Sequence, residues 1–181
     1  MPDLIQREVL TKEKLALFHD FDCGESADQP WVQAVNDWIT GRSADDCAAL
    51  DIKNRRCKVF LYRNQAGDLI GFGSLGKTKA QWPMPDGPKI PVAIIPWIGL
   101  DKRYHGQPKG QDADGNEEIR YSDQIVADLV YEAKNYNVEA LFLFVDPRNT
   151  GAIRLYSRNG FASSNAPLEA GELMRMAVSL A

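Results

Sequence analysis

The sequence predicts an α/β protein, and three observations support this fold class. Residues 92–100 are apolar almost throughout, as in a strand that is buried on both faces. Residues 58–63 and 69–75 have the pattern of two antiparallel strands, joined by a turn that contains Asn64 and Gly67. Further along, apolar residues repeat at helical spacing and form one core-facing stripe, which consists of Ile125, Val126, Leu129, Val130 and Ala133.

The composition is typical of one globular domain. The chain has 181 residues, of which 44% are hydrophobic, and this is enough for one sizeable core but short for two domains. A formal net charge of -4 gives no overall attraction to nucleic acid or to anionic membranes. Cys23, Cys47 and Cys57 are odd in number and form no Cys-x-x-Cys pair, which favours reduced thiols over disulfides or a metal site. With no signal region and no bilayer-length apolar stretch, we expect a cytoplasmic protein without a membrane partner.

The first third of the chain has the pattern of one strand and two helices. Residues 7–10 predict a short strand, and Thr11 is placed to cap a helix that follows it. Residues 29–40 predict a longer helix, and Gly41 fits the position after its end. The side chains expected to face the core are Leu15, Leu17 and Phe18 in the first helix, and Trp31, Val32, Val35, Trp38 and Ile39 in the second.

Glycine and proline mark irregular points in the central strands. Gly71 and Gly73 lie inside a predicted strand, where glycine leaves room for close backbone approach or a bulge. Residues 77–89 are polar and proline-rich, and we expect them to form a connection. Pro96 cannot donate to a strand ladder, so the strand over residues 91–100 is predicted to carry a bulge at Pro96 and Trp97.

The last third of the chain predicts two helices and two strands. Residues 121–136 form the main helix, with Ser122 as its N-cap and Asn137 as its C-cap, and a strand follows to residue 145. Asn149 or Thr150 then caps a short helix, and Gly160 fits the left-handed position after its end. Residues 172–180 add the last strand.

A turn rich in glycine and cations, residues 101–110, joins the apolar strand to the main helix. Strand, loop and helix together direct free backbone N–H groups and the positive end of a helix dipole at one spot. Such a spot binds anions, so the sequence predicts a phosphate site here.

Residues 103–108, Arg-Tyr-His-Gly-Gln-Pro, resemble the acyl-CoA pyrophosphate loop of the GCN5-related N-acetyltransferases (GNAT). The motif of that family runs Gln or Arg, two residues, Gly, one residue, and Gly or Ala. Pro108 replaces the last small residue and removes an N–H group. A polar insertion over residues 111–118 precedes the helix, and we expect it to be a solvent-exposed loop, while Lys109 and Gly110 offer a donor and a flexible position.

Residues 140–161 resemble a second block of the same family, which consists of a strand, an asparagine, a helix and a Tyr-x-x-x-Gly-Phe ending. Tyr156, Gly160 and Phe161 match that ending. The resemblance implies a single acyl-CoA N-acyltransferase domain over residues 1–181. It also implies a mixed, mostly antiparallel central sheet flanked by helices, with a bulged fourth strand that splays from the next and opens a slot for pantetheine.

The function implied by the resemblance is direct acetyl transfer from acetyl-CoA, as co-substrate, to a primary amine, with no metal. A backbone N–H near Ile98 would stabilise the oxyanion, and Tyr156 would protonate the departing thiolate. The general base stays open between Asp101, Asp146 and a water relay. The implied cofactor-binding residues are Ile98, Leu100, Arg103, His105, Gly106, Gln107, Lys109, Gly110, Ser122, Asn149, Ala152 and Tyr156. The expected partner is a small-molecule or peptide amine, and a homodimer stays open.

Two alternative functions are carried beside this one. Residues 21–24, Phe-Asp-Cys-Gly, resemble a segment of a toxin-type branch of the family, whose members acetylate aminoacyl-tRNA and pair with small antitoxins. That function calls for a cationic face, which Lys53, Arg55, Arg56 and Lys58 could form unless they belong to a solvated loop. The other alternative is a non-catalytic acyl-CoA-binding regulatory domain, which Pro108 and the insertion favour and Tyr156 opposes.

Overall fold

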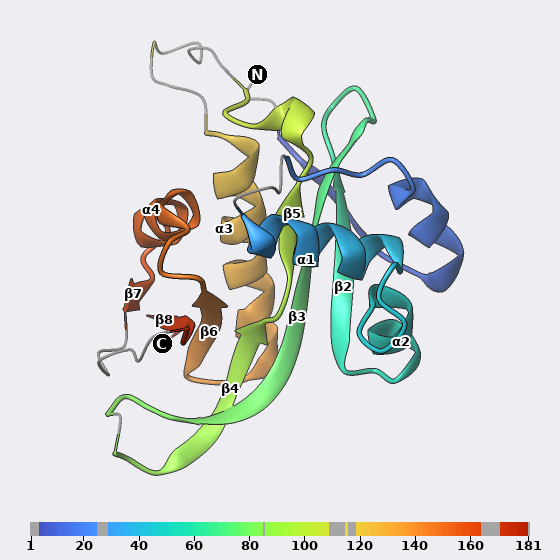
Figure 1. Ribbon diagram of the computed structural model, residues 1–181. Coiled ribbons are helices and arrows are strands. Elements are labelled where there is room, and N and C mark those ends of the chain that lie inside the picture. The colour runs from blue at the N-terminus through green and yellow to red at the C-terminus, as the bar shows by residue number, and fades with distance from the viewer. Residues whose placement is uncertain are drawn as a thin grey trace. The chain divides into compact units, whose positions relative to one another are not determined.

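The computed structural model describes residues 4–24, 29–84, 86–108, 115, 119–163 and 171–180. It divides into two compact units, which we describe separately. Figure 1 labels the helices and strands. Unit 1 comprises residues 1–74 and 97–125, and unit 2 comprises residues 75–96 and 126–181. The single domain predicted from the sequence stays a prediction.

Unit 1 is built around antiparallel strands. Its elements are β1 (Gln6–Val9), the 3-10 helix η1 (Lys12–Phe18), α1 (Pro30–Thr40), α2 (Ala48–Lys53), β2 (Cys57–Arg63), the first part of β3 (Leu69–Gln81), β5 (Ile98–Leu100), the 3-10 helix η2 (Lys102–Tyr104) and the start of α3 (Tyr121–Ala133). β1 pairs with β2, and β5 pairs with β3, both antiparallel. The predicted hairpin is confirmed, since the Asp68 amide donates to Asn64 Oδ1 at 2.8 Å in the turn between β2 and β3.

Aromatic rings form the core of unit 1. Trp38 of α1 stacks on Phe72 of β3 with ring centroids 5.5 Å apart, and Phe18 and Phe21 pack edge-on against the same ring. The predicted helix over residues 29–40 is confirmed, and Gly41 ends it with a left-handed φ of 74°.

The prediction for Leu17 is wrong, because 46% of its surface is exposed. The segment is a 3-10 helix with three residues per turn, so Leu15 and Phe18 share one side and Leu17 turns away. The predicted N-cap at Thr11 is in the right place, although its side chain makes no capping hydrogen bond.

Unit 2 contains the rest of the sheet. Its elements are the second part of β3, β4 (Lys89–Ile95), most of α3, the 3-10 helix η3 (Lys134–Tyr136), β6 (Ala140–Val145), α4 (Thr150–Arg158), β7 (Ala162–Ser163) and β8 (Met174–Ser179). β4 pairs with β6 in parallel, whereas β3 with β4, β6 with β8, and β7 with β8 are antiparallel pairs. Asn137 ends the helical segment with a φ of 52°, as predicted.

The prediction that residues 77–89 form a connection is wrong for most of the segment. β3 continues to Gln81 and pairs with β4, so only the turn between Gln81 and Lys89 is irregular. One face of this hairpin packs Ala80, Trp82 and Ile90 against a buried cluster that includes Phe142. The other face is solvated, and its lysines hid the alternating pattern that marks a half-buried strand.

The predicted bulge at Pro96 and Trp97 is confirmed by the strand register. Gly76 pairs with Ile94, and Gly73 pairs with Ile98. Between these pairs, residues 74–75 of β3 lie opposite residues 95–97, which are one residue longer. One extra residue at this point defines a β-bulge. The break divides the predicted strand into β4 and β5.

Strand pairing gives the order β1-β2-β3-β4-β6-β8-β7, with β5 on β3. The sheet is therefore mixed and mostly antiparallel, and the predicted fold class is confirmed. α3 begins at Tyr121, so Ser122 lies in its first turn and is not the predicted N-cap. Among the described residues, no helix has the length and apolar character needed to cross a membrane.

Candidate functional site

Two residues of β5 direct their backbone N–H and C=O groups away from β3. The Asp101 amide donates to Ile70 O at 2.8 Å, and the Ser74 amide donates to Trp97 O at 2.9 Å. Hydrogen-bonded and non-hydrogen-bonded pairs alternate along an antiparallel ladder. The residues between these pairs, Ile98 and Leu100, therefore direct their N–H and C=O groups away from β3.

The outward groups of Leu100 are occupied, whereas those of Ile98 are open. The Leu100 backbone interacts with the Cys23 thiol and acts to lower its pKa, and the Leu100 carbonyl lies 3.1 Å from His105 Nε2. Across the described chain, neither outward group of Ile98 has a protein partner. The Ile98 N–H is thus available to a ligand at the edge of β5.

The turn after β5 leaves one amide open. Protein oxygens accept hydrogen bonds from the amides of Lys102, Arg103, Tyr104, His105 and Gln107. The Gly106 amide has no such acceptor within the described ranges. Gly106 has a left-handed φ of 70°, which favours glycine. Among the described residues of the predicted phosphate turn, the open donor is therefore the Gly106 N–H.

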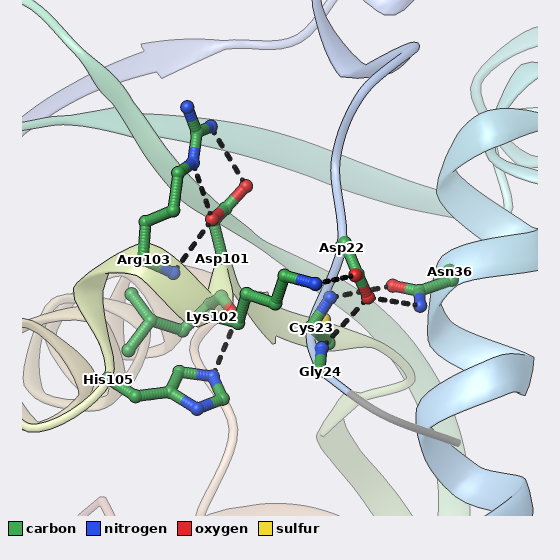
Figure 2. A network of polar contacts seen from close by, with 9 residues as sticks. Asp22, Cys23, Gly24, Asn36, Asp101, Lys102, Arg103 and His105 are labelled. Atoms are coloured by element: carbon green, nitrogen blue, oxygen red, sulfur yellow. Dashed lines mark hydrogen bonds and ion pairs between the residues drawn. The ribbon is translucent and has the colours of Figure 1, made fainter. Parts of the chain in front are cut away.

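Two cations of the turn are held by carboxylates, as Figure 2 shows. Lys102 Nζ lies 2.7 Å from Asp22 Oδ2, and this contact, first among several, lowers the pKa of Asp22. Arg103 Nε and Nη2 donate to the two carboxylate oxygens of Asp101 at 2.8 and 3.0 Å. Burial raises the pKa of Asp101, but the contacts with Arg103 outweigh it and the pKa is lowered. The positive charge of the turn is therefore partly neutralised.

The remaining predicted residues of the turn lie beside these groups or beyond the described ranges. Gln107 O accepts the Tyr121 amide at 2.7 Å and so joins the turn to the start of α3, beside Ser122. Lys109 and Gly110 lie outside the described residues, as does the insertion over residues 111–118 apart from Gly115.

In unit 2, the start of α4 repeats the arrangement of the turn. Asn149 Oδ1 accepts the Ala152 amide at 3.1 Å and caps the helix. Arg148 Nε and Nη2 donate to the carboxylate of Asp146 at 2.9 and 2.7 Å, and the pair lowers the pKa of Asp146 to about 2. Asp146 and Arg148 therefore copy the geometry of Asp101 and Arg103 at the end of another strand.

Tyr156 is the buried polar residue of α4. Its exposed fraction is 7%, and its ring centroid lies 5.9 Å from that of Phe161. Burial raises the pKa of the phenol, so the hydroxyl keeps its proton at neutral pH. A protonated phenol can serve as a proton donor.

The structure distributes the predicted site residues over both units. Unit 1 contains Ile98, Leu100, Arg103, His105, Gly106, Gln107 and Ser122, and unit 2 contains Asn149, Ala152 and Tyr156. The part that Asn36 plays beside Asp22 was not predicted from the sequence. The signal was a buried asparagine among the apolar positions of α1, where Asn36 is 7% exposed. Within the described ranges, no group of three or more His, Cys, Asp or Glu side chains is placed to hold a metal ion.

Comparison with known proteins gives similarity in structure only. No family model matches the sequence, and no curated protein matches it. A bacterial toxin structure has a TM-score of 0.68 at 16% identity, over 99% of this chain and 92% of that chain. A mutant of the AtaT toxin, bound to the C-terminus of the antitoxin AtaR and acetyl-CoA, has a TM-score of 0.64 at 17% identity, over 98% and 94%.

A third similar structure is the PaiA N-acetyltransferase from Thermoplasma acidophilum in complex with coenzyme A. Its TM-score is 0.65 at 14% identity, over 97% of this chain and 98% of that chain. At such low identity, the matches establish the fold and leave the activity to be argued from the site. The chain therefore has the fold of the GCN5-related N-acetyltransferases.

Proposed function

We propose that the protein is an acetyl-CoA-dependent N-acetyltransferase that transfers the acetyl group directly to an amine. The observation that carries this proposal is the pair of open amides in unit 1, on Ile98 at the edge of β5 and on Gly106 in the turn. An acyl-CoA presents a thioester carbonyl and a diphosphate, which need donors at two separate points. Similar structures that contain acetyl-CoA or coenzyme A support the same cofactor.

In the proposed reaction, a neutral amine attacks the thioester carbonyl and forms a C–N bond. The Ile98 N–H donates to the oxyanion of the tetrahedral intermediate. The C–S bond then breaks, and Tyr156 gives its proton to the departing thiolate of coenzyme A. The amine loses a proton as the amide forms, and Tyr156 recovers one from solvent.

Burial and ion pairing also limit the catalytic roles that Cys23, Asp101 and Asp146 can have. Burial raises the pKa of the Cys23 thiol to about 12, which argues against an acyl-cysteine intermediate. Asp101 and Asp146 have lowered pKa values because each is paired with an arginine, so both are weak bases. A water relay to bulk solvent is therefore the favoured route for the proton of the amine.

The other predicted cofactor-binding residues are assigned to parts of the cofactor near the two open amides. Around the diphosphate, beside the open Gly106 amide, we place the predicted residues of the turn and of the start of α3, namely Arg103, His105, Gln107, Lys109, Gly110 and Ser122. Leu100, Asn149 and Ala152 are assigned to the pantetheine arm. The acceptor is a small-molecule or peptide amine.

Two measurements test the proposal in sequence. Calorimetric titration with acetyl-CoA should show saturable binding, and a thiol-release assay with a panel of amines should then show turnover with at least one of them. Binding without turnover on any amine would support the alternative of a non-catalytic acyl-CoA-binding regulatory domain. Absence of binding would contradict both.

We expect Gly106→Val to weaken coenzyme A binding by about 1–3 kcal/mol. A branched side chain at a φ of 70° strains the turn and obstructs the approach of a phosphate to the open amide. Gly67→Val is the matched control, because Gly67 has a φ of 88° in another turn of unit 1. Calorimetry and thermal denaturation of both variants separate lost binding from lost stability. Equal coenzyme A affinities in the two folded variants would show that Gly106 is not at the phosphate site.

A second candidate function is acetylation of aminoacyl-tRNA, and a row of lysines favours it. Lys77 and Lys79 face Ala93 and Pro91 across the β3–β4 hairpin, and Lys89 faces Gln81. Cross-strand partners share a face, so the three lysines lie on one side of the hairpin. All three are exposed, and within the described residues none of them pairs with a carboxylate. Lys77 Nζ lies 5.3 Å from the Tyr136 ring centroid. The similar AtaT toxin has been solved with acetyl-methionyl-tRNAfMet.

The cationic face predicted from the sequence is less favourable for nucleic acid. Arg56 Nη1 lies 3.6 Å from Asp51 Oδ1, and Lys58 Nζ lies 5.0 Å from the Phe60 ring centroid. Two of the four predicted cations are therefore engaged within the protein.

If the tRNA hypothesis is right, replacing Lys77, Lys79 and Lys89 together with alanine should weaken tRNA binding. The slope of log affinity against log salt should fall by up to about 3, since each phosphate contact contributes about 0.9. Fluorescence anisotropy with labelled tRNA over a salt series measures both quantities. Lys53→Ala with Arg55→Ala is the matched control on the other cationic segment. A larger loss of tRNA affinity in that control would indicate that the nucleic-acid site lies at residues 53–58 instead.

A further inference from the structure

Residues 21–24 are joined directly to the turn that follows β5, as Figure 2 shows. The Lys102 amide donates to Asp22 O at 2.8 Å, and Lys102 Nζ lies 2.7 Å from Asp22 Oδ2. The Asp22 backbone also contributes to the lowered pKa of the Asp101 carboxyl. Two direct polar contacts thus connect two segments that lie about eighty residues apart in the sequence.

Asp22 is itself held in place by α1. Its Oδ1 atom accepts the Gly24 amide at 2.9 Å and Asn36 Nδ2 at 3.1 Å. Asn36 Oδ1 accepts the Cys23 amide at 2.9 Å, and Asn36 is 7% exposed. The buried carboxamide therefore fixes both the backbone and the carboxylate of this segment, so Asp22 presents Oδ2 to Lys102 from a rigid position.

Lys102 is the first residue of η2, the short helix that forms the turn. The His105 amide donates to Lys102 O at 3.2 Å, so the position of Lys102 sets that of the backbone just before Gly106. Contact with Asp22 at both its amide and its ammonium group limits the movement of Lys102. The direction of the open Gly106 N–H depends on this arrangement.

We propose that Asp22 is a positioning residue, which acts through Lys102 to hold the turn in the shape that presents Gly106 N–H to the cofactor diphosphate. This inference rests on the proposed acetyl-CoA-dependent function. It gives the Phe-Asp-Cys-Gly segment a role in binding the cofactor, whichever amine is the acceptor. Asp22 does not need to touch the cofactor.

The test uses Asp22→Asn, which keeps the shape of the side chain and removes its charge. Coenzyme A should bind roughly threefold to tenfold more weakly, as expected for loss of one hydrogen bond of ordinary strength. The KM for acetyl-CoA should rise with it, while kcat should change less than about twofold, because the reacting groups are untouched. In a Lys102→Met background, Asp22→Asn should change coenzyme A affinity less than about twofold, since Asp22 acts through the Lys102 side chain.

Asp37→Asn is the matched control on α1, the helix whose Asn36 holds Asp22. Asp37 has a similar side-chain exposure, 33% against 36% for Asp22, and it contacts Arg42 and Gln33, which lie outside the turn. Hydrogen exchange of the amides from Lys102 to Gln107 supplies a readout that needs no ligand. Exchange should be faster in Asp22→Asn than in the wild type and unchanged in Asp37→Asn.

Each outcome decides the proposal. Unchanged or tighter coenzyme A binding by Asp22→Asn would overturn it, and tighter binding would mean that Asp22 competes with phosphate for Lys102. Equal weakening by Asp37→Asn would overturn it as well, because the effect would then belong to α1 in general. If the wild type does not bind coenzyme A, the proposed function is wrong, and the exchange rates alone decide whether Asp22 holds the turn.

Discussion

Replacing Tyr156 with phenylalanine should lower kcat at least about tenfold and leave acetyl-CoA affinity nearly unchanged. The substitution removes one oxygen from a ring that is 7% exposed and packs against Phe161, so the helix and its core contacts remain. What is lost is the proton for the departing thiolate. Because burial raises the pKa of the phenol, that proton is present at neutral pH in the wild type.

Tyr136→Phe is the control for this measurement. Tyr136 also belongs to unit 2, and its hydroxyl donates to Leu75 O at 3.4 Å, so the variant loses a tyrosine hydroxyl with a structural partner. Steady-state kinetics of both variants, with calorimetric titration of acetyl-CoA, give kcat and affinity separately. Equal kcat values for Tyr156→Phe and the wild type would remove Tyr156 from the mechanism.

Local sequence signals predicted the elements whose pattern is complete within a few residues. Gly41 and Asn137 mark helix ends because a left-handed φ is needed there, and both have one. Pro96 revealed the bulge because proline cannot donate to a ladder. In each case one residue type restricts the backbone strongly enough to be recognised without knowledge of the fold.

Elements that depend on tertiary packing were missed. The outer half of β3 is a strand because Ala80 and Trp82 pack on the cluster around Phe142, yet its sequence contains as many lysines as apolar residues. α2 was not predicted, since six residues are too few to show a helical period. Packing partners distant in sequence decide both elements.

The position of the turn after β5 was predicted, but its side-chain contacts were not. The glycine and the cations of residues 103–107 located the turn in the sequence. The sequence did not show that Lys102 and Arg103 are held by Asp22 and Asp101, because charge pairing depends on which segments meet. The amide available on β5 also follows from the register with β3, which no local pattern encodes.

Gly71→Ala should lower the free energy of unfolding by about 2–3 kcal/mol, the range expected for overpacking against atoms that cannot move aside. A Cβ atom at Gly71 would lie 2.4 Å from Gly99 O, 3.2 Å from Ile125 Cδ1 and 3.3 Å from Leu100 Cα. The nearest of these atoms is backbone of β5, the strand that is paired with β3 at this point. Relief of the clash would require the two strands to separate, so the strain cannot be relaxed by a side-chain rotation.

Urea denaturation of Gly71→Ala and Gly151→Ala tests this expectation. A Cβ atom at Gly151 would meet only Asn149 Oδ1 at 3.8 Å, an ordinary contact, within α4. Alanine is favoured over glycine inside a helix by about 1 kcal/mol, so Gly151→Ala should be neutral or stabilising. The two substitutions add the same methyl group, and the difference between them isolates the effect of its surroundings. A folded Gly71→Ala variant with wild-type stability would show that β3 and β5 do not approach as closely as the register requires.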